Sequence, residues 1–370
     1  MKRTISIKLL PAEEQGQALF GLQQAFAHAC NAIVPFAVEH RCWNQVALHH
    51  LTYYPIREQS QLGSQMVCNS IKAVCNAYRA LKPQKGKEVS VISFKPNGSI
   101  HFDKRTYSIK DKVVSLYTLA GRAKIKMQPG AFQKAYLEQG TPKEAELVFR
   151  GGKWFFNLVL ELPDRPPTRG DLTLGVDLGE NNMATTSSGK ILEGGQLRHN
   201  RDRYLALRRR LQSNGSQSAK QLLRKISGKE QRHMKQVNHE VSKAIVSEAL
   251  RYGASTIVME DLTNIRRRIR AGKRMRSRLH RWAWAQLQGF VQYKAEAAGL
   301  RVAYVNPAYS SQTCSVCGCL GRRVKHRFFC SHCGSQQHSD LNASQNLCRL
   351  AMSADVATGA VNRPDVAGYA

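Results

Sequence analysis

The segment Leu172-Thr173-Leu174-Gly175-Val176-Asp177 is a short apolar run that ends in an acid. Its length and apolar content are typical of a buried β-strand. A second run of this kind, residues 255–259 (Ser-Thr-Ile-Val-Met), ends at Glu260. Further strands are expected at 183–186 and 301–305, and apolar residues at helical spacing predict helices around 237–249 and 284–298. The second half of the chain is therefore predicted to be a mixed α/β domain.

Three acids in this half could form one site. Asp177 and Glu260 follow the carboxyl ends of predicted strands, where an open α/β sheet has its ligand crevice, and Asp340 begins a segment that can form a helix beside this edge. Carboxylates are ligands for Mg²⁺, and two such ions about 3.5–4 Å apart stabilise both the attacking and the leaving oxygen of a phosphodiester. A strand-end acid by itself is more often a cap or a salt-bridge partner, and the joint context favours a metal site. Asp261, next to Glu260, and Glu180, beside the first turn, are the alternative acids, and we interpret Asp261 as a supporting or capping group.

Two cysteine pairs form the most specific local pattern in the chain. Each is a Cys-x-x-Cys sequence followed by glycine, and the four cysteines are Cys314, Cys317, Cys330 and Cys333. This spacing predicts a structural Zn²⁺ held by four thiolates, in a ribbon inserted before Asp340. Substitute ligands at Cys319, His326, His332 or His338 remain open, as does a redox dithiol. The other five cysteines lie mainly in helical patterns and are interpreted as small core residues.

The charge of the chain points to a polyanion. The 56 Lys and Arg residues outnumber the 26 Asp and Glu residues and give a net charge of +30, which favours binding to nucleic acid by counterion release. Two arginine-rich segments flank Glu260 in sequence. The residues predicted to contact nucleic acid are Arg208, Arg209, Arg210, Arg266, Arg267, Arg268, Arg270, Lys273, Arg274, Arg276 and Arg278.

The first half of the chain has a different pattern. Alternation of apolar and polar residues predicts an opening strand that ends at Pro11, and helical spacing then predicts an insert that ends near Pro83. Short strands follow at 89–94, 99–102, 113–116 and 124–127, and a hairpin is expected around Gly151 and Gly152. We expect a β-barrel or sandwich with a helical insertion, joined to the second half by a linker at 163–170.

No segment has the pattern of a signal peptide or the length of a membrane span. Membrane binding is not expected, because the basic patches have no amphipathic helix with an anchoring face. We therefore expect an intracellular protein whose cysteines are thiols or metal ligands.

The second half resembles TnpB, the RNA-guided nuclease family of insertion sequences, which is related to compact type V CRISPR effectors. The resemblance rests on four motifs, which are Gly175-Val176-Asp177-Leu178-Gly179 with Ala184-Thr185, Ile257-Val258-Met259-Glu260-Asp261-Leu262, Ser311-Gln312-Thr313-Cys314-Ser315-Val316-Cys317-Gly318, and Asp340-Leu341-Asn342-Ala343 with Asn346. It covers residues 171–350 well and the first half in layout only. Where the family commonly has an Asp-Arg-Asp-like sequence, this chain has His338-Ser339-Asp340.

The resemblance implies a multidomain α+β protein with a β-barrel-like wedge domain and an RNase H-like (RuvC) domain. The implied boundaries are 1–10 and 86–165 for the wedge domain, 11–85 for a helical recognition domain, 166–313 and 334–353 for the RuvC nuclease domain, 314–333 for the zinc ribbon, and 354–370 for a flexible tail. It further implies that Asp177, Glu260 and Asp340 hold Mg²⁺, with two ions per site, and cleave double-stranded DNA selected by a guide RNA. The implied location is the cytoplasm, at the nucleoid of a prokaryote.

Three other functions compete with an RNA-guided endonuclease. A guided repressor without nuclease activity would be expected to have lost one of the acids, and all three are present. A transposase with an RNase H core would join DNA ends without a guide. A compact type V CRISPR effector shares the same core, and only a neighbouring repeat array would distinguish it.

Overall fold

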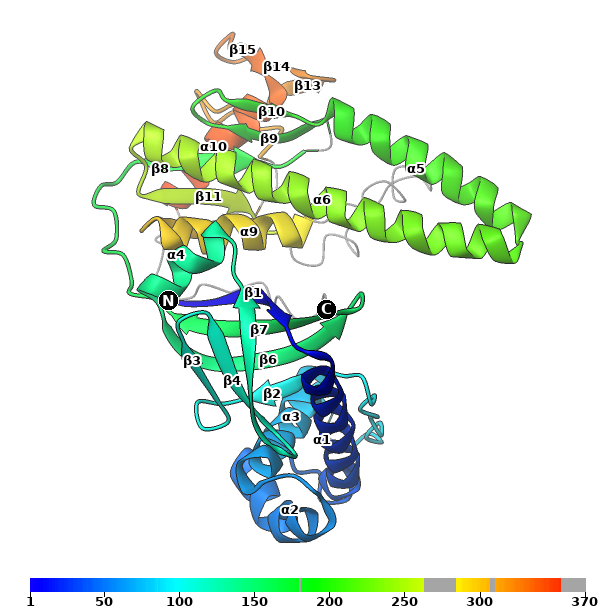
Figure 1. Cartoon of the computed structure of the whole chain (residues 1–370). Helices are drawn as coiled ribbons and strands as arrows, with labels where there is room; N and C mark the ends of the chain where they lie inside the picture. Colours follow the sequence, from blue (N-terminus) through cyan, green and yellow to red (C-terminus); the bar gives the residue numbers. More distant parts are fainter. Residues whose placement is uncertain (85, 180, 263–283, 307–309, 354–370) are drawn as a thin grey trace. The chain divides into compact units, whose positions relative to one another are not determined.

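The computed structural model of the chain describes residues 1–84, 86–179, 181–262, 284–306 and 310–353 (Figure 1). The chain divides into two compact units, Met1–Pro163 and Asp164–Ala370. The division lies at the first residue of the predicted linker at 163–170. The tail expected at 354–370 and Glu180 lie outside the described residues. Among the helices that the structure describes, none combines the length and apolar character needed to cross a membrane.

The first unit is built on a seven-stranded antiparallel sheet that curls into a nearly closed, barrel-like form (Figure 1). Its strands are β1 (Lys2–Leu10), β2 (Ile100–Phe102), β3 (Tyr107–Lys110), β4 (Val113–Thr118), β5 (Gly121–Gln128), β6 (Thr141–Arg150) and β7 (Lys153–Glu161). The order in the sheet is β2-β6-β7-β1-β5-β4-β3. The alternation read in the opening segment is confirmed, because Ile5, Ile7 and Leu9 are buried in the core while β1 pairs with both β5 and β7.

The hairpin between β6 and β7 is also confirmed. Gly151 and Gly152 both have positive φ, 58° and 72°, which is the conformation that a two-residue type I′ turn requires. Phe149 pairs with Trp154 across this turn. The two aromatic rings lie 5.0 Å apart, so the hairpin end is stabilised by a cross-strand aromatic pair.

Three helices are inserted between β1 and β2. They are α1 (Glu13–Glu39), α2 (Gln45–Gln59) and α3 (Ser64–Leu81). The apolar stripes predicted for α1 and α3 are buried and belong to the same core as the sheet. The sequence interpretation did not identify α2, nor the short helix α4 (Ala131–Gln139) between β5 and β6.

The predicted strand at 89–94 is wrong. This segment has no regular secondary structure and pairs with no strand in the described chain, and side chains of the helical insertion bond to part of its backbone. Asn31 of α1 donates from Nδ2 to the Phe94 carbonyl at 2.9 Å and accepts from the Phe94 amide at 2.7 Å. Tyr78 of α3 donates its hydroxyl to the Ser90 carbonyl at 3.2 Å. Periodicity indicates an extended segment and does not identify its hydrogen-bond partner.

The second unit contains a five-stranded mixed sheet of order β10-β9-β8-β11-β12. Its strands are β8 (Thr173–Asp177), β9 (Asn182–Thr186), β10 (Ile191–Glu193), β11 (Thr256–Glu260) and β12 (Arg301–Val305). The pairs β8–β11 and β11–β12 are parallel, and Met259 is in register with Val176. The carboxyl ends of β8 and β11 therefore lie next to each other, as the two acid-terminated strands predicted.

Helices cover both faces of this sheet. Leu174 and Val176 of β8 point into a core formed with α6 (Gln217–Tyr252) and α9 (Trp284–Ala297), and α5 (Gly195–Asn214) pairs with α6 as a long hairpin (Figure 1). Gly175 lies between these two residues and points to the opposite face, where it contacts α10 (Ser339–Ser353). The predicted helix that begins near Asp340 is thus confirmed.

A small three-stranded sheet precedes α10. Its strands are β13 (Arg322–Val324), β14 (Arg327–Phe329) and β15 (Gln336–His338), in the order β13-β14-β15. All four predicted zinc-ligating cysteines lie in or next to this segment, which we call the ribbon (residues 313–338). Phe328 is fully buried and forms a small core with Cys314 and Cys330, one cysteine from each pair.

Candidate functional site

The carboxylates of Asp177 and Glu260 meet at the edge of the five-stranded sheet. Each is the last residue of its strand, and the parallel register puts the two strand ends side by side. The two carboxyl groups share a hydrogen bond, and Ser310 donates a further one to Glu260. Gln288 of α9 holds the backbone carbonyl of Glu260 through a 2.7 Å bond from its side-chain amide. The backbone amide of Asp261 donates to the Val305 carbonyl at 2.7 Å and fixes the end of β11 against β12.

The pKa values of Asp177 and Glu260 are both raised, mainly because the two carboxyl groups are buried. Burial raises the pKa of Asp177 well above its usual range, and the neighbouring charges of Glu260 and Asp340 raise it further. Burial also raises the pKa of Glu260, against the hydrogen bonds from Asp177 and Ser310, which lower it. Clustered carboxylates with raised pKa values are characteristic of sites that bind a cation or handle protons.

Asp340 approaches this pair from the first turn of α10. Its side chain is buried, with 7% of the residue exposed. Asn182 of β9 donates to its Oδ2 at 3.0 Å, while Arg323 of the ribbon and the Ser339 hydroxyl donate to its Oδ1 at 3.2 and 3.1 Å. Because Asp340 contributes to the raised pKa of Asp177, all three predicted acids lie in one electrostatic environment.

The absence of a side chain at Gly175 allows α10 to approach β8 closely. A Cβ atom at this position would lie 1.9 Å from the backbone carbonyl oxygen of Ser344 and 2.9 Å from Cys348 Sγ. Any other residue would therefore push α10 away from the sheet. Since α10 carries Asp340, Gly175 controls the distance between the third acid and the other two.

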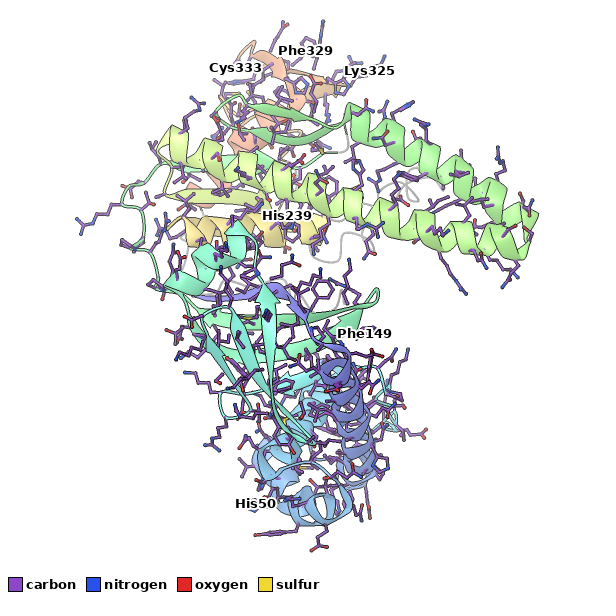
Figure 2. All side chains as sticks on the ribbon, viewed as in Figure 1. His50, Phe149, His239, Lys325, Phe329 and Cys333 are labelled. Atoms are coloured by element: carbon purple, nitrogen blue, oxygen red, sulfur yellow. The ribbon has the colours of Figure 1, made fainter. Side chains whose placement is uncertain are left out.

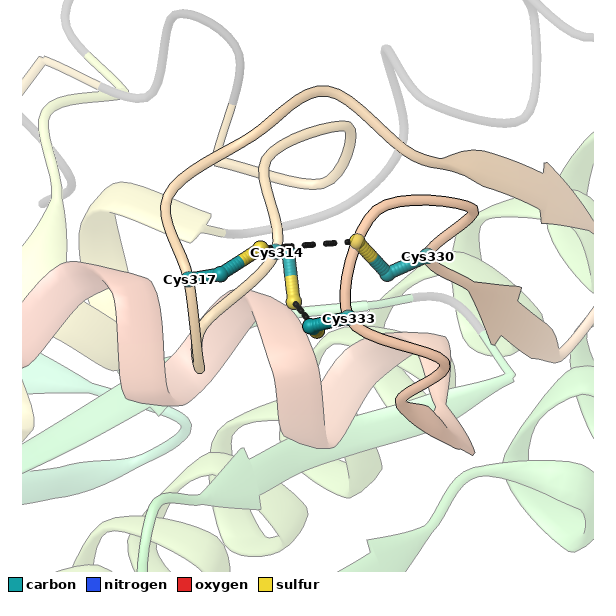
Figure 3. Close-up of side chains that lie close together, drawn as sticks. All are labelled: Cys314, Cys317, Cys330 and Cys333. Atoms are coloured by element: carbon teal, nitrogen blue, oxygen red, sulfur yellow. Dashed lines mark hydrogen bonds between the residues drawn. The ribbon is translucent and has the colours of Figure 1, made fainter.

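The four ribbon cysteines form a compact sulfur cluster (Figure 3). The sulfur atoms of Cys314 and Cys333 are 3.7 Å apart, those of Cys317 and Cys330 are 3.5 Å apart, and all four lie within 4.8 Å of one another. Tetrahedral Zn²⁺ with bonds of about 2.3 Å requires sulfur separations of about 3.8 Å. The donor set and its spacing therefore fit zinc.

The two cysteine pairs have the same local structure. Gly318 donates its amide to the Cys314 carbonyl at 2.9 Å, and Gly334 donates to the Cys330 carbonyl at 3.0 Å. Both glycines have positive φ, 81° and 73°, a conformation that other residues adopt only with strain. Among the alternative ligands, Cys319 and His332 form a second group that shares Cys317 with the four-cysteine cluster.

Buried amides attach the ribbon to α10. Asn342 accepts from the Ser315 amide at 2.9 Å and donates to the Thr313 carbonyl at 2.7 Å. Asn346, one turn later, donates to the carbonyls of Ser310 and Thr313 at 2.8 and 2.6 Å. One face of α10 thus links the cysteine cluster to the helix that carries Asp340.

The predicted nucleic-acid residues have different surroundings. Arg208 in α5 is half-buried and forms an ion pair with Glu230 of α6 at 2.6 Å, so it stabilises the α5–α6 hairpin. Arg209 and Arg210 are exposed on α5. The remaining eight, Arg266, Arg267, Arg268, Arg270, Lys273, Arg274, Arg276 and Arg278, lie outside the described residues.

The sequence interpretation missed several polar residues that contact the acids. Asn182 and Arg323 bind Asp340, Ser310 binds Glu260, and Gln288 holds the backbone at Glu260. Isolated polar residues of this kind have no local pattern. The spacing of Asn342 and Asn346, four residues apart and so on one face of a helix, was the one available signal.

Two family models match the second half of the chain. The model described as "Probable transposase" (OrfB_IS605) matches residues 157–266, and the model described as "Cas12f1-like, TNB domain" matches residues 284–347. The first match includes Asp177 and Glu260, and the second includes the four ribbon cysteines and Asp340.

Relatives and solved structures agree with these models. The TnpB-like protein MJ0751 of Methanocaldococcus jannaschii is 42% identical over 137 residues, which are 36% of this chain and 49% of that protein. The CRISPR-associated endodeoxyribonuclease Cas12f1 of Sulfoacidibacillus thermotolerans is 28% identical over 347 residues, which are 81% of this chain and 80% of that protein. The chain thus spans about half the length of the first relative and most of the second. CasPhi-2 (Cas12j) bound to crRNA has a similar fold, with a TM-score of 0.51 and 10% identity over 95% of this chain and 98% of that one. The chain is therefore similar to the TnpB-like proteins and to Cas12f1.

Proposed function

We propose that this protein is an RNA-guided DNA endonuclease of transposon origin, which hydrolyses target DNA at a single RuvC-type site. The observation that carries the proposal is the meeting of three acids from distant parts of the sequence, Asp177, Glu260 and Asp340, at one sheet edge. The endonuclease name of Cas12f1 and the strong positive charge support it.

Mg²⁺ fits this site. Two half-buried carboxylates that share a hydrogen bond, with a third close enough to raise the pKa of Asp177, form an oxygen donor set whose mutual repulsion a divalent cation relieves. Bound there, two ions would supply charge stabilisation to the attacking and leaving oxygens of a phosphodiester. Asp177 and Glu260 hold fixed positions at their strand ends. The Asn182 amide and the Arg323 guanidinium orient Asp340.

We assign the first unit to guide and target-motif binding, with the barrel-like sheet as the wedge domain and α1–α3 as the recognition domain. The second unit then comprises the RuvC domain and the inserted zinc ribbon. The ribbon's role in this assignment is to brace α10, because Asn342 and Asn346 connect the cysteine cluster to the helix of Asp340. The partners are a guide RNA and double-stranded DNA.

The test is to purify the chain together with its bound RNA, sequence that RNA, and measure Mg²⁺-dependent cleavage of matching DNA. We expect one discrete RNA with a variable segment and cleavage that Asp177→Ala abolishes. Asp171→Ala is the matched control, because Asp171 is an exposed acid just before the same strand. Random RNA fragments, or full cleavage by the Asp177→Ala variant, would contradict the proposal.

A transposase is the second candidate, since the model matching residues 157–266 is described as a probable transposase. Such an enzyme would join DNA ends by strand transfer without RNA. Joined products from RNA-free protein would favour this function over guided cleavage, and their absence alongside guided cleavage would exclude it.

A further inference from the structure

A second group of metal-binding side chains lies where the ribbon meets α10. His326, His338 and Asp340 each offer one ligand atom, and these three atoms lie within 4.8 Å of one another. The two imidazole rings are nearly parallel, with centroids 5.7 Å apart and planes inclined by 12°. This group is separate from the four-cysteine cluster, with which it shares no residue.

The topology of the ribbon brings these side chains together. His326 lies in the turn between β13 and β14, directly after Lys325, which is labelled in Figure 2. His338 ends β15 and pairs with Arg327, the residue that follows His326. The backbone amide of Ser339 donates to the His326 carbonyl at 2.8 Å, so the turn is fixed against the start of α10.

The three side chains differ in burial. Asp340 is buried and held by three hydrogen bonds, and its backbone amide donates to His338 Nδ1 at 3.3 Å. His326 is exposed, so an ion can reach its ring from solvent, and this ring stacks on that of His338. The group therefore combines one buried carboxylate with a histidine that is open to solvent.

We propose that His326, His338 and Asp340 form a binding site for a borderline divalent transition metal such as Zn²⁺. Two imidazoles and one carboxylate are the donors that zinc uses in His₂-carboxylate sites, whereas Mg²⁺ prefers oxygen ligands. Arg323 already places a positive charge on Asp340 and competes with the ion. We therefore expect this site to bind the metal ion more weakly than the four-thiolate cluster and to be occupied only after that cluster.

Occupation of this site has a consequence for cleavage. Asp340 would belong to two sites, one with Asp177 and Glu260 and one with the two histidines. A transition metal bound to the histidines holds the Asp340 carboxylate and withdraws it from the other acids, so it inhibits Mg²⁺-dependent cleavage. This inhibition rests on the proposed nuclease function, whereas the metal binding does not.

Metal binding is tested on the full chain purified with one zinc per molecule. Titration with Co²⁺, followed by absorption and by metal analysis, should show that the wild type binds one further equivalent of metal, a Co²⁺ ion in addition to its zinc. His326→Asn should weaken it at least tenfold and leave the first zinc in place, while the control His199→Asn, at an exposed histidine of α5, should bind like the wild type. No further equivalent in the wild type, or wild-type binding by His326→Asn, would overturn the proposal. A thiolate-to-cobalt charge-transfer band from this equivalent would also overturn it, because that band assigns the ion to the group of Cys317, Cys319 and His332.

Inhibition is tested by adding Zn²⁺ to the cleavage reaction at a large excess of Mg²⁺. His326→Asn should raise the half-inhibitory Zn²⁺ concentration at least tenfold and leave the uninhibited rate unchanged. If the second metal binds and cleavage continues at the same rate, the inhibitory role is wrong. If no condition supports cleavage, the proposed function fails while the binding result still decides the metal site.

Discussion

Replacing Gly175 with alanine should separate α10 from the sheet. The new Cβ would lie 1.9 Å from the backbone carbonyl oxygen of Ser344, and real Cβ atoms essentially never come within 3.0 Å of another heavy atom in this way. The helix must therefore move by at least about 1 Å relative to β8. Because the obstacle is a backbone atom, a change of the Ser344 side chain cannot relieve the clash.

The expected cost has two parts. Overpacking of a tight contact lowers the free energy of unfolding by about 1–3 kcal/mol, and a rigid backbone obstacle favours the upper end of that range. Asp340 lies one turn before Ser344, so the same movement draws its carboxylate away from Asp177 and Glu260. A displacement of about 1 Å among reacting groups lowers a rate by roughly 100-fold.

Two measurements check this prediction. Denaturant unfolding gives the change in stability, and Mg²⁺-dependent cleavage by the protein with its RNA gives the change in rate. Gly195→Ala is the matched control, because a Cβ there meets no atom within 4 Å, and its stability should stay within about 0.5 kcal/mol of the wild type. If Gly175→Ala matches this control in both stability and cleavage, the packing argument is refuted.

Three further predictions concern single side chains. Asp177→Asn removes one of the adjacent carboxylates, so in EDTA it should unfold at a higher temperature than the wild type, and it should gain less stability from added Mg²⁺; a lower unfolding temperature in EDTA would contradict the repulsion argument. Cys330→Ser should lose the ribbon zinc in metal analysis while Cys42→Ser retains it, and retention by both variants would exclude the four-thiolate site. The Arg251 side chain, by hydrogen bonding, lowers the pKa of Glu248 to about 2, so this ion pair stabilises the folded state above pH 4 and its contribution is lost as the pH falls from about 4 to 2. Glu248→Gln should show a flatter stability profile over this range in acid unfolding, and an unchanged profile would contradict the assignment.

Periodicity in the sequence was sufficient to predict most elements around the site. The strands that end at Asp177 and Glu260, the two cysteine pairs and the helix at Asp340 could be read from a few neighbouring residues, because each depends on local geometry and burial. The predicted strand at 89–94 is wrong because its backbone hydrogen bonds go to side chains of two helices, Asn31 of α1 and Tyr78 of α3, and not to a neighbouring strand.

Sequence alone determined which residues have metal-binding chemistry and how strands, helices and cysteine pairs follow one another. Only the tertiary structure decided which groups meet: Asn182 and Arg323 hold Asp340, Gly175 lets its helix approach the sheet, and two histidines of the ribbon lie beside the same carboxylate. The physical reason is range. Strand alternation and cysteine spacing act over a few residues, whereas these contacts form only when the sheet, the ribbon and α10 are packed together.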